Sequence, residues 1–183
     1  FLLKKDYQVV GVAQAGDRED FWRLDYLKIF DKIRIAIGDI ADRDFIEKLL
    51  VNVGAQEFYN LAGQSSVAKS WDDPVGTFKS NTVGVVNILE LMRRVSPVTK
   101  FFQASSAEMY GDVKTVINEK SGQFSPKNPY ATAKLAAHLA VKNFRAQYGL
   151  FACSGVLFTH ASPLQADFTV MKKIVATVAR ISR

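Results

Sequence analysis

The chain has 183 residues, enough for one domain with a sizeable buried core, and its 48% hydrophobic and 23% charged residues exclude intrinsic disorder. The net charge of +6 is spread over isolated doublets such as Lys4–Lys5 and Arg93–Arg94, a pattern typical of a solvated surface, so no nucleic-acid partner is expected. No apolar run approaches the roughly 20 residues of a membrane span, so no membrane partner is expected either.

The first half of the chain alternates between strand and helix character. The opening FLLKKDYQVV is interpreted as the last turns of a helix that began upstream. Two short β-branched runs, YQVVGVA (7–13) and IRIAIGD (33–39), predict buried strands. DRDFIEKLLVNVG then places apolar side chains on one helical face, and Gly54 lies where a helix C-cap favours glycine.

The second half continues the alternation. Its predicted elements are the strand EFYNLAG, the helix VGVVNILELMRRV, the strand KFFQASS, a long helix from Tyr130 closed by Gly149, the strand FACSGVLF and a helix from about Val170. The single cysteine, Cys153, is interpreted as a small core residue, and its being alone rules out an internal disulfide. Apolar strands that are each followed by a helix predict an α/β fold with a parallel sheet covered on both faces.

A Rossmann-like, doubly wound sheet of this kind begins with a strand and a Gly-rich turn that holds a pyrophosphate. The chain contains no GxGxxG or related run. In the strand order 3-2-1-4-5-6 the absent strand is the central one. We therefore expect the turn upstream and the domain truncated, with a different α/β topology as the alternative.

The sharpest chemical signal is Tyr130–Ala–Thr–Ala–Lys134, which places a phenol and an ammonium on one face of a helix. A nearby ammonium favours phenolate and lowers the pKa of a tyrosine toward that of a useful general base. The motif also occurs by chance as a surface pair. Here, however, Pro129 precedes the tyrosine, and an irregular stretch from Gly111, of a length typical of functional loops, leads into it.

A second signal is the run ASSAEMYG (104–111) at the end of a predicted strand. Small polar residues at the carboxyl ends of parallel strands line the ligand cleft. Ser106 is a candidate hydrogen-bond partner for a substrate oxygen, and Glu108 is a candidate acid–base carboxylate. The alternative is a polar loop with one solvated glutamate. His138 is interpreted as a helix-face residue, and two distant histidines predict no metal site.

Five strings occur in order and at suitable separations: GDIAD (38–42), EFYNLAGQSSV (57–67), KFFQASSAEMYG (100–111), NPYATAK (128–134) and the HASPL run from His160. On these strings the chain resembles the GDP-mannose 4,6-dehydratase family of the extended short-chain dehydrogenase/reductase superfamily. The resemblance implies an incomplete NAD(P)-binding Rossmann-like domain over residues 1–158. Residues 159–183 would begin a substrate-binding region whose remaining lobe is absent from the chain.

The resemblance also implies an activity, the conversion of GDP-mannose or another nucleotide sugar to a 4-keto-6-deoxy product. Tyr130 would take the proton of the sugar 4-hydroxyl while hydride passes from C4 to the nicotinamide. Lys134 would lower the pKa of Tyr130 and hold the nicotinamide ribose. Glu108 would remove the C5 proton as water leaves C6, hydride would return to C6, and Ser106 would bond the 4-oxygen.

The cofactor that the resemblance implies is NADP, with NAD possible. Its binding residues would be Asp39 and Ile40 by the adenine, Leu61, Ala62 and Gly63 along the cleft, and Tyr130, Lys134 and His160. The substrate would contact Ser65, Ser106, Glu108 and Thr159. The arginines that usually read the NADP 2′-phosphate are replaced around Ala15 and Gly16, and Arg18 is a nearby substitute.

Other departures from the family pattern leave alternatives open. Ala107 replaces a hydroxyl residue, Thr159 and Ala161 replace an Asn and a Glu that help to hold substrate, and residues 165–171 lack the usual Arg-Gly. A non-catalytic nucleotide-binding paralogue is therefore one alternative. A related epimerase or 4-keto reductase, which does not need the carboxylate of Glu108, is another. The resemblance further implies a homodimer or homotetramer, and the single cysteine is consistent with a reducing, cytoplasmic location.

Overall fold

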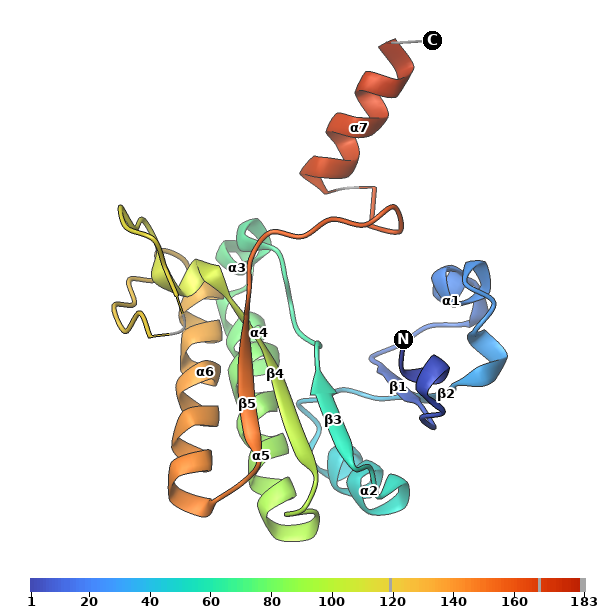
Figure 1. Cartoon of the computed structure of the whole chain (residues 1–183), viewed down its shortest axis with the longest axis vertical. Coiled ribbons are helices and arrows are strands. Elements are labelled where there is room, and N and C mark those ends of the chain that lie inside the picture. The colour runs from blue at the N-terminus through green and yellow to red at the C-terminus, as the bar shows by residue number, and fades with distance from the viewer. Residues whose placement is uncertain (119, 168, 182–183) are drawn as a thin grey trace.

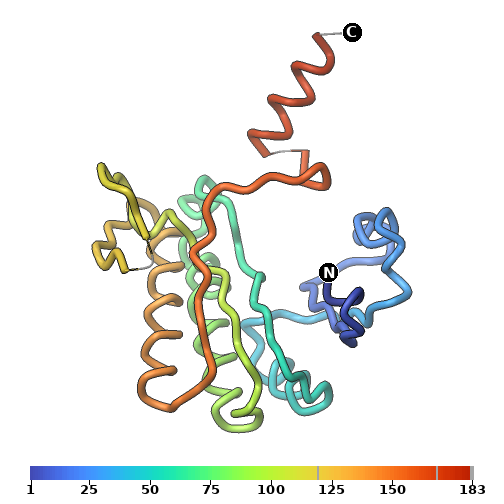
Figure 2. The backbone as a smooth tube through the Cα atoms, in the orientation of Figure 1, coloured from blue at the N-terminus to red at the C-terminus, as the bar shows by residue number. Residues whose placement is uncertain are grey.

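Strands and helices alternate in the computed structural model, which describes residues 1–118, 120–167 and 169–181 (Figure 1 and Figure 2). The strands are β1 Val10–Ala13, β2 Arg34–Ile37, β3 Glu57–Asn60, β4 Lys100–Ser106 and β5 Ala152–Leu157. The α-helices are α1 Trp22–Tyr26, α2 Arg43–Val53, α3 Val67–Asp72, α4 Pro74–Phe78, α5 Gly84–Val95, α6 Pro129–Tyr148 and α7 Val170–Ile181. Short 3₁₀ turns are η1 Leu2–Lys5, η2 Arg18–Phe21, η3 Phe30–Lys32 and η5 Ala107–Tyr110, and η4 Lys79–Val83 is a π-helical turn.

The strands form two parallel sheets instead of one. β1 pairs with β2, and β3, β4 and β5 form a second sheet in that order, with Phe101 of β4 opposite Phe58 and Ala152. The division lies between β1 and β3, where a doubly wound sheet has its central strand. The predicted α/β fold with parallel strands is confirmed, whereas a continuous sheet is not formed among the described residues.

Helix bounds follow from local capping. Asp42 begins α2, because its Oδ1 accepts hydrogen bonds from the backbone N–H groups of Asp44 (3.0 Å) and Phe45 (3.1 Å). Asn128 begins α6 in the same way, accepting from Ala131 N at 2.8 Å. Gly54 and Gly149 end these helices with φ of 56° and 67°, left-handed values that glycine adopts without strain. Both helices match the sequence-based prediction.

Other boundaries differ from the prediction. The N-terminal segment forms only the turn η1, and β1 and β2 are each four residues long, shorter than the runs 7–13 and 33–39. The helical series α3, α4 and η4 was not predicted. A new helix, α4, begins at Pro74, where Asp73 Oδ1 accepts a hydrogen bond from Gly76 N at 2.8 Å. Helical structure therefore precedes Val83, the residue at which the predicted helix begins.

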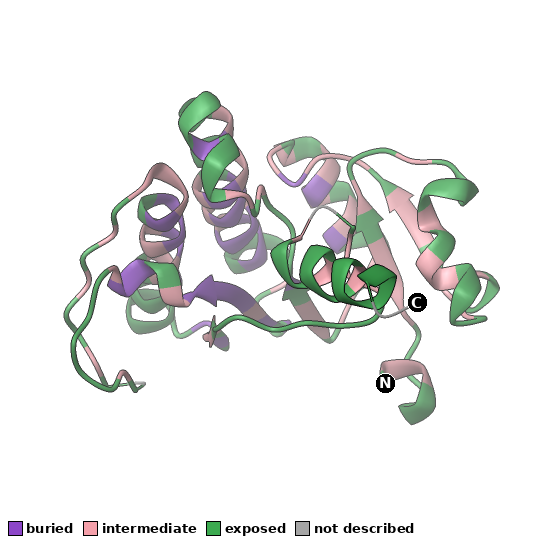
Figure 3. Ribbon diagram, turned by 90° about the horizontal axis from the view of Figure 1, so that it is seen from above, coloured by how far each residue is buried: buried purple, intermediate pink, exposed green. Residues whose placement is uncertain are grey.

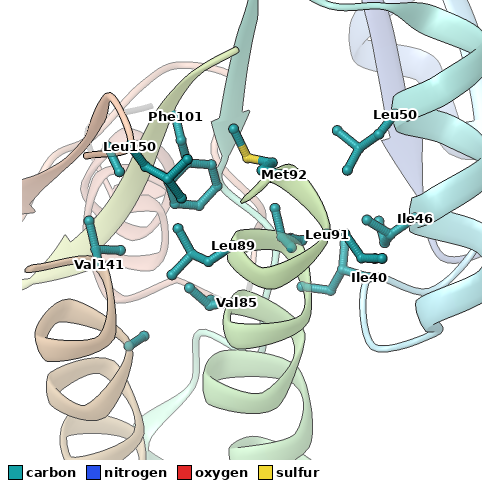
Figure 4. Close-up of a cluster of buried hydrophobic side chains, with 13 residues drawn as sticks. Ile40, Ile46, Leu50, Val85, Leu89, Leu91, Met92, Phe101, Val141 and Leu150 are labelled. Atoms are coloured by element: carbon teal, nitrogen blue, oxygen red, sulfur yellow. The ribbon is translucent and has the colours of Figure 1, made fainter. Parts of the chain in front are cut away.

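The main core lies between the three-stranded sheet and the helices α2, α5 and α6. Its fully buried side chains include Ile46, Ile88, Leu89, Phe101 and Val141. In Figure 4, Leu89 of α5 lies toward Phe101 and Val141, whereas Leu91 lies toward Ile40 and Ile46. α5 therefore joins the sheet to α2, which explains its strongly apolar sequence.

The opposite face of the three-stranded sheet is more open. Tyr59, Phe102 and Cys153 lie side by side in the strand register, and Tyr59 and Cys153 are exposed. The interpretation of Cys153 as a core residue is therefore wrong, because its side chain lies on this open face. α7 extends away from the sheet (Figure 1), and its residues are exposed or partly exposed (Figure 3). Among the described residues, none of the helices combines the length and apolarity that a membrane crossing requires.

Candidate active site

Ser106 is the last residue of β4 and caps the turn η5. Its Oγ accepts a hydrogen bond from the backbone N–H of Glu108 at 3.2 Å, and only 8% of the residue is exposed. Because the hydroxyl accepts in this bond, its own proton stays free to be donated to a ligand oxygen. The cap also fixes the start of η5, the turn that carries the exposed carboxylate of Glu108.

Lys134 lies beneath Tyr130 on α6. The Lys134 Nζ is 5.9 Å from the centroid of the Tyr130 ring and donates a hydrogen bond to the backbone oxygen of Ala104 on β4 at 3.0 Å. The lysine is 7% exposed, and this burial lowers its pKa. An ammonium has three donors, and among the described residues the structure gives this one a single partner, so two remain to bind a ligand.

The four residues predicted to be catalytic lie on adjoining elements. α6, which carries Tyr130 and Lys134, packs against both β4 and η5, which carry Ser106 and Glu108. The hydrogen bond from Lys134 to β4 joins the two groups directly. The arrangement offers a phenol, an ammonium, a hydroxyl and a carboxylate at the carboxyl end of one sheet, where ligands bind in open α/β folds.

His138 of α6 contacts β4 next to these four residues. Its Nδ1 is 3.1 Å from the Oγ of buried Ser105, the neighbour of Ser106 on β4. The imidazole also meets the ring of Phe124 edge-on at 5.8 Å, and Phe124 stacks on Tyr110 at 5.2 Å. Burial lowers the pKa of His138, and the positive charges of Lys142 and Arg145 add to this effect. The residue predicted only to lie on a helix face thus ties α6 to β4 and to the loop before α6.

That loop leaves η5 through Gly111, which has a φ of 63° and a ψ of −143°. A Cβ at this position would collide with the backbone oxygen of Ser125. Gly111→Ala is therefore expected to lower the free energy of unfolding by ~1–3 kcal/mol. Gly122→Ala, in the same loop but with open space around its Cβ, is the matched control. Equal urea midpoints for the two variants would contradict the strain assigned to Gly111.

Asn81, which the sequence analysis missed, holds the segment after β3. It is 1% exposed, its Oδ1 accepts from Gln64 N at 2.9 Å, and its Nδ2 donates to Gln64 O at 2.8 Å. These bonds fix the exposed strip of Leu61, Ala62 and Gly63 and leave Ser65 exposed beside it. Its neighbours Lys79, Ser80 and Thr82 are polar as well, so the sequence does not single out Asn81, and the π-helical turn that presents it has no sequence signature.

The remaining predicted site residues follow β2 and β5. Asp39 is tied into the fold, because its Oδ1 accepts from Ala41 N at 2.8 Å and its Oδ2 from Gln14 Nε2 at 3.1 Å. Ile40 points into the core, so only its backbone is available to a ligand. Thr159 and His160 are exposed just after β5. The structure thus places Asp39 and Ile40 after the other sheet, apart from the group around Tyr130.

Sequence comparison identifies close similarity along the whole chain. The family model for GDP-mannose 4,6 dehydratase matches residues 1–183. The chain is 34% identical to the GDP-mannose 4,6-dehydratase of Vibrio cholerae serotype O1 over 190 residues, covering 100% of the chain and 51% of that protein. It is also 34% identical to the human GDP-mannose 4,6 dehydratase over 189 residues, covering 99% of the chain and 51% of that protein. The chain therefore spans about half the length of the curated relatives it matches.

Solved structures show the same fold. The UDP-glucuronic acid 4-epimerase of Bacillus cereus, in complex with UDP-glucuronic acid and NAD, aligns with a TM-score of 0.84 and 20% identity over 98% of this chain and 57% of that one. A double mutant of DesIV, a dTDP-glucose 4,6-dehydratase of Streptomyces venezuelae with NAD and DAU bound, aligns with a TM-score of 0.82 and 21% identity over 98% and 56%. The match of the family model over the whole chain shows that the chain belongs to the GDP-mannose 4,6-dehydratase family.

Proposed function

We propose that this chain is the dinucleotide-binding part of an enzyme that converts GDP-mannose to GDP-4-keto-6-deoxymannose. The observation that carries the proposal is the buried ammonium of Lys134 beneath the phenol of Tyr130, at the end of the strand that leads into Glu108. The names of the relatives support GDP-mannose as the nucleotide sugar. We further propose that residues 1–158 bind the dinucleotide and that residues 159–183 begin the substrate-binding region.

In this proposal the residues around Tyr130 move protons at C4 of the sugar. Tyr130 accepts the proton of the 4-hydroxyl, Ser106 donates a hydrogen bond to the 4-oxygen, and Lys134 stabilises the phenolate. A ketone at C4 acidifies the neighbouring C5 proton, and Glu108 accepts it as water leaves C6. Ser65 and Thr159 contact the substrate from the ends of β3 and β5.

A nicotinamide dinucleotide, when bound, supplies the acceptor and donor of hydride. Lys134, which α6 holds against β4, fits its ribose, because the two remaining donors of its ammonium suit hydroxyl oxygens. The strip of Leu61, Ala62 and Gly63, together with His160, is proposed to line the cleft, and Asp39 and the backbone of Ile40 to lie by the adenine. The resemblance implies NADP, whereas the two solved structures with this fold hold NAD. The choice between the two depends on the loop that follows β1.

The proposal is tested with the full-length protein, a nicotinamide dinucleotide and a panel of nucleotide sugars, with products followed by mass spectrometry. Loss of one water from GDP-mannose is the expected result. A change of configuration without loss of mass, detected by chromatography, would indicate the epimerase alternative instead. Nucleotide binding without any product would indicate the non-catalytic paralogue, the alternative suggested by Ala107, Thr159 and Ala161.

Glu108→Gln is expected to separate the two halves of the reaction. The variant keeps Tyr130 and Lys134, so oxidation at C4 proceeds, whereas loss of water slows by about 10²–10⁴-fold because the C5 base is gone. Mass spectrometry of quenched single turnovers would show a sugar nucleotide lacking two hydrogens but retaining its water. Asp112→Asn, an exposed carboxylate just beyond η5, is the control. Wild-type loss of water in Glu108→Gln would exclude Glu108 as the base.

We also propose a homodimer or homotetramer in the cytoplasm. The single cysteine suits a reducing compartment. Members of the superfamily often pair through the helices equivalent to α6 and its neighbour, and Val83 and Leu139 are apolar residues exposed on this pair of segments. Sedimentation velocity of the full-length protein would measure the oligomeric state, and a monomer at micromolar concentration would contradict this part of the proposal.

A further inference from the structure

The loop that follows β1 bears on the choice of cofactor, an inference that rests on the proposed dinucleotide-binding function. In dinucleotide-binding folds a carboxylate at the end of the second strand takes the ribose 2′-hydroxyl of NAD, whereas an arginine there accommodates the 2′-phosphate of NADP. β1 is the strand that pairs with the outer strand β2, and so corresponds to that second strand. Residues 14–20 carry three carboxylates, those of Asp17, Glu19 and Asp20, and one cation, Arg18.

The guanidinium of Arg18 already has partners. It binds Asp25 Oδ1 at 2.7 Å and both carboxylate oxygens of Asp31, at 3.1 and 3.4 Å. It also lies over the ring of Phe30, 4.2 Å from the ring centroid. One exposed ion pair contributes little, but two carboxylates and an aromatic face converge on this one group. Two negative charges therefore neutralise the only cation of the loop.

Two backbone amides of the loop are also engaged. Asp17 N donates to Asp20 Oδ2 at 2.9 Å, and Asp20 N donates to the backbone oxygen of Asp17 at 3.0 Å. Free amides at such a turn bind phosphate well, but these two donors already have partners within the loop. The carboxylates keep further lone pairs that can accept from a hydroxyl group. The loop is thus suited to a ribose hydroxyl and unsuited to a dianion.

Two other arginines, Arg23 and Arg43, interact with other parts of the chain. Arg23 donates its Nε–H to Leu164 O at 2.7 Å and lies over the ring of Trp22. Arg43, at the start of α2, lies close enough to Glu90 of α5 to help to lower the pKa of that carboxyl. The fit between these residues and a 2′-phosphate is therefore poor.

We propose that this protein binds NAD in preference to NADP, and that the acidic loop 14–20, with Arg18 held by Asp25 and Asp31, is the specificity-determining element. A 2′-phosphate would approach three carboxylates without a free cation. The loss of one charge-assisted contact corresponds to about a tenfold difference in affinity or more.

Isothermal titration of the full-length protein with NAD and with NADP tests the preference without any need for turnover. NAD is expected to bind at least about tenfold more tightly. NADP binding more tightly than NAD would overturn the inference and leave the proposed dehydratase intact. Binding of neither dinucleotide would overturn the proposed function itself, and this inference with it.

Variants of the ion pairs test the mechanism. Arg18→Gln is expected to change the NAD-to-NADP affinity ratio by less than about threefold, the same as Arg94→Gln, an exposed cation on α5 that gives the same change of charge. Asp25→Asn combined with Asp31→Asn frees Arg18 and is expected to strengthen NADP binding by about threefold to tenfold, with NAD unchanged. Asp6→Asn with Glu47→Gln is its charge-matched control. A tenfold selective loss of NADP binding in Arg18→Gln would show that Arg18 reads the phosphate, and would overturn the inference.

Discussion

Replacing Tyr130 by phenylalanine is expected to lower kcat for loss of water from GDP-mannose by about 10²–10⁴-fold. The phenol is the group placed to take the proton of the sugar 4-hydroxyl, with Lys134 Nζ 5.9 Å from its ring. Removing one oxygen from a half-buried ring leaves its packing on α6 intact, so thermal stability is expected to stay near wild type. Mass spectrometry of the product and thermal denaturation measure turnover and stability separately.

Tyr148→Phe is the matched control for this variant. Tyr148 lies at the other end of the same helix, packs against Phe144 and is half exposed, so its hydroxyl has no place in the proposed chemistry. A fall of less than tenfold in Tyr130→Phe would assign the proton transfer to another group. A parallel loss in Tyr148→Phe would point to a general effect on α6.

Replacing Lys134 by methionine is expected to lower turnover while preserving or raising stability. Turnover should fall at least about a hundredfold, because the phenolate of Tyr130 loses its neighbouring positive charge. At neutral pH a buried ammonium costs free energy, so an apolar side chain of similar length is expected to raise the free energy of unfolding by up to about 2 kcal/mol. The backbone oxygen of Ala104, which loses Lys134 as a donor, still accepts from Gln103 Nε2 at 3.1 Å.

The difference in stability between wild type and Lys134→Met is expected to depend on pH. Burial lowers the pKa of Lys134 in the folded state, so between the folded and unfolded pKa values the unfolded chain binds more protons. Wild-type stability relative to Lys134→Met should therefore rise as the pH increases through that window, toward the ordinary lysine pKa. Chemical denaturation of both proteins at several alkaline pH values measures this difference.

Lys142→Met, an exposed lysine on the same helix, is the control for the Lys134 experiment. A change of the same size with pH in Lys142→Met would point to a general effect of charge on α6. If Lys134→Met instead lost more than about 2 kcal/mol, the bond to Ala104 would be an essential structural tie between α6 and β4. Loss of turnover would then say little about the chemistry of the ammonium.

Features that depend on near neighbours could be predicted from the amino-acid sequence. The bounds of α2 and α6 follow from Asp42, Asn128 and two closing glycines, each acting within one turn of its helix. The spacing of Tyr130 and Lys134 likewise placed both on one helix face. Such features are readable because capping and helical periodicity involve residues three or four positions apart.

Contacts between residues distant in sequence could not be predicted in this way, because they depend on how the helices and strands pack. Lys134 binds Ala104 thirty positions away, and His138 meets Ser105 thirty-three positions away. The exposure of Cys153 also depended on which face of the sheet the helices cover, which an apolar run does not reveal.

The ion-pair partners of Arg18, at the proposed cofactor site, could not be predicted from the sequence either. Its sequence position suggested a phosphate reader, but the folded chain brings Asp25 and Asp31 to its guanidinium. Charges can be counted in a sequence, but whether a cation is free to bind a ligand depends on which carboxylates the fold places within hydrogen-bonding distance.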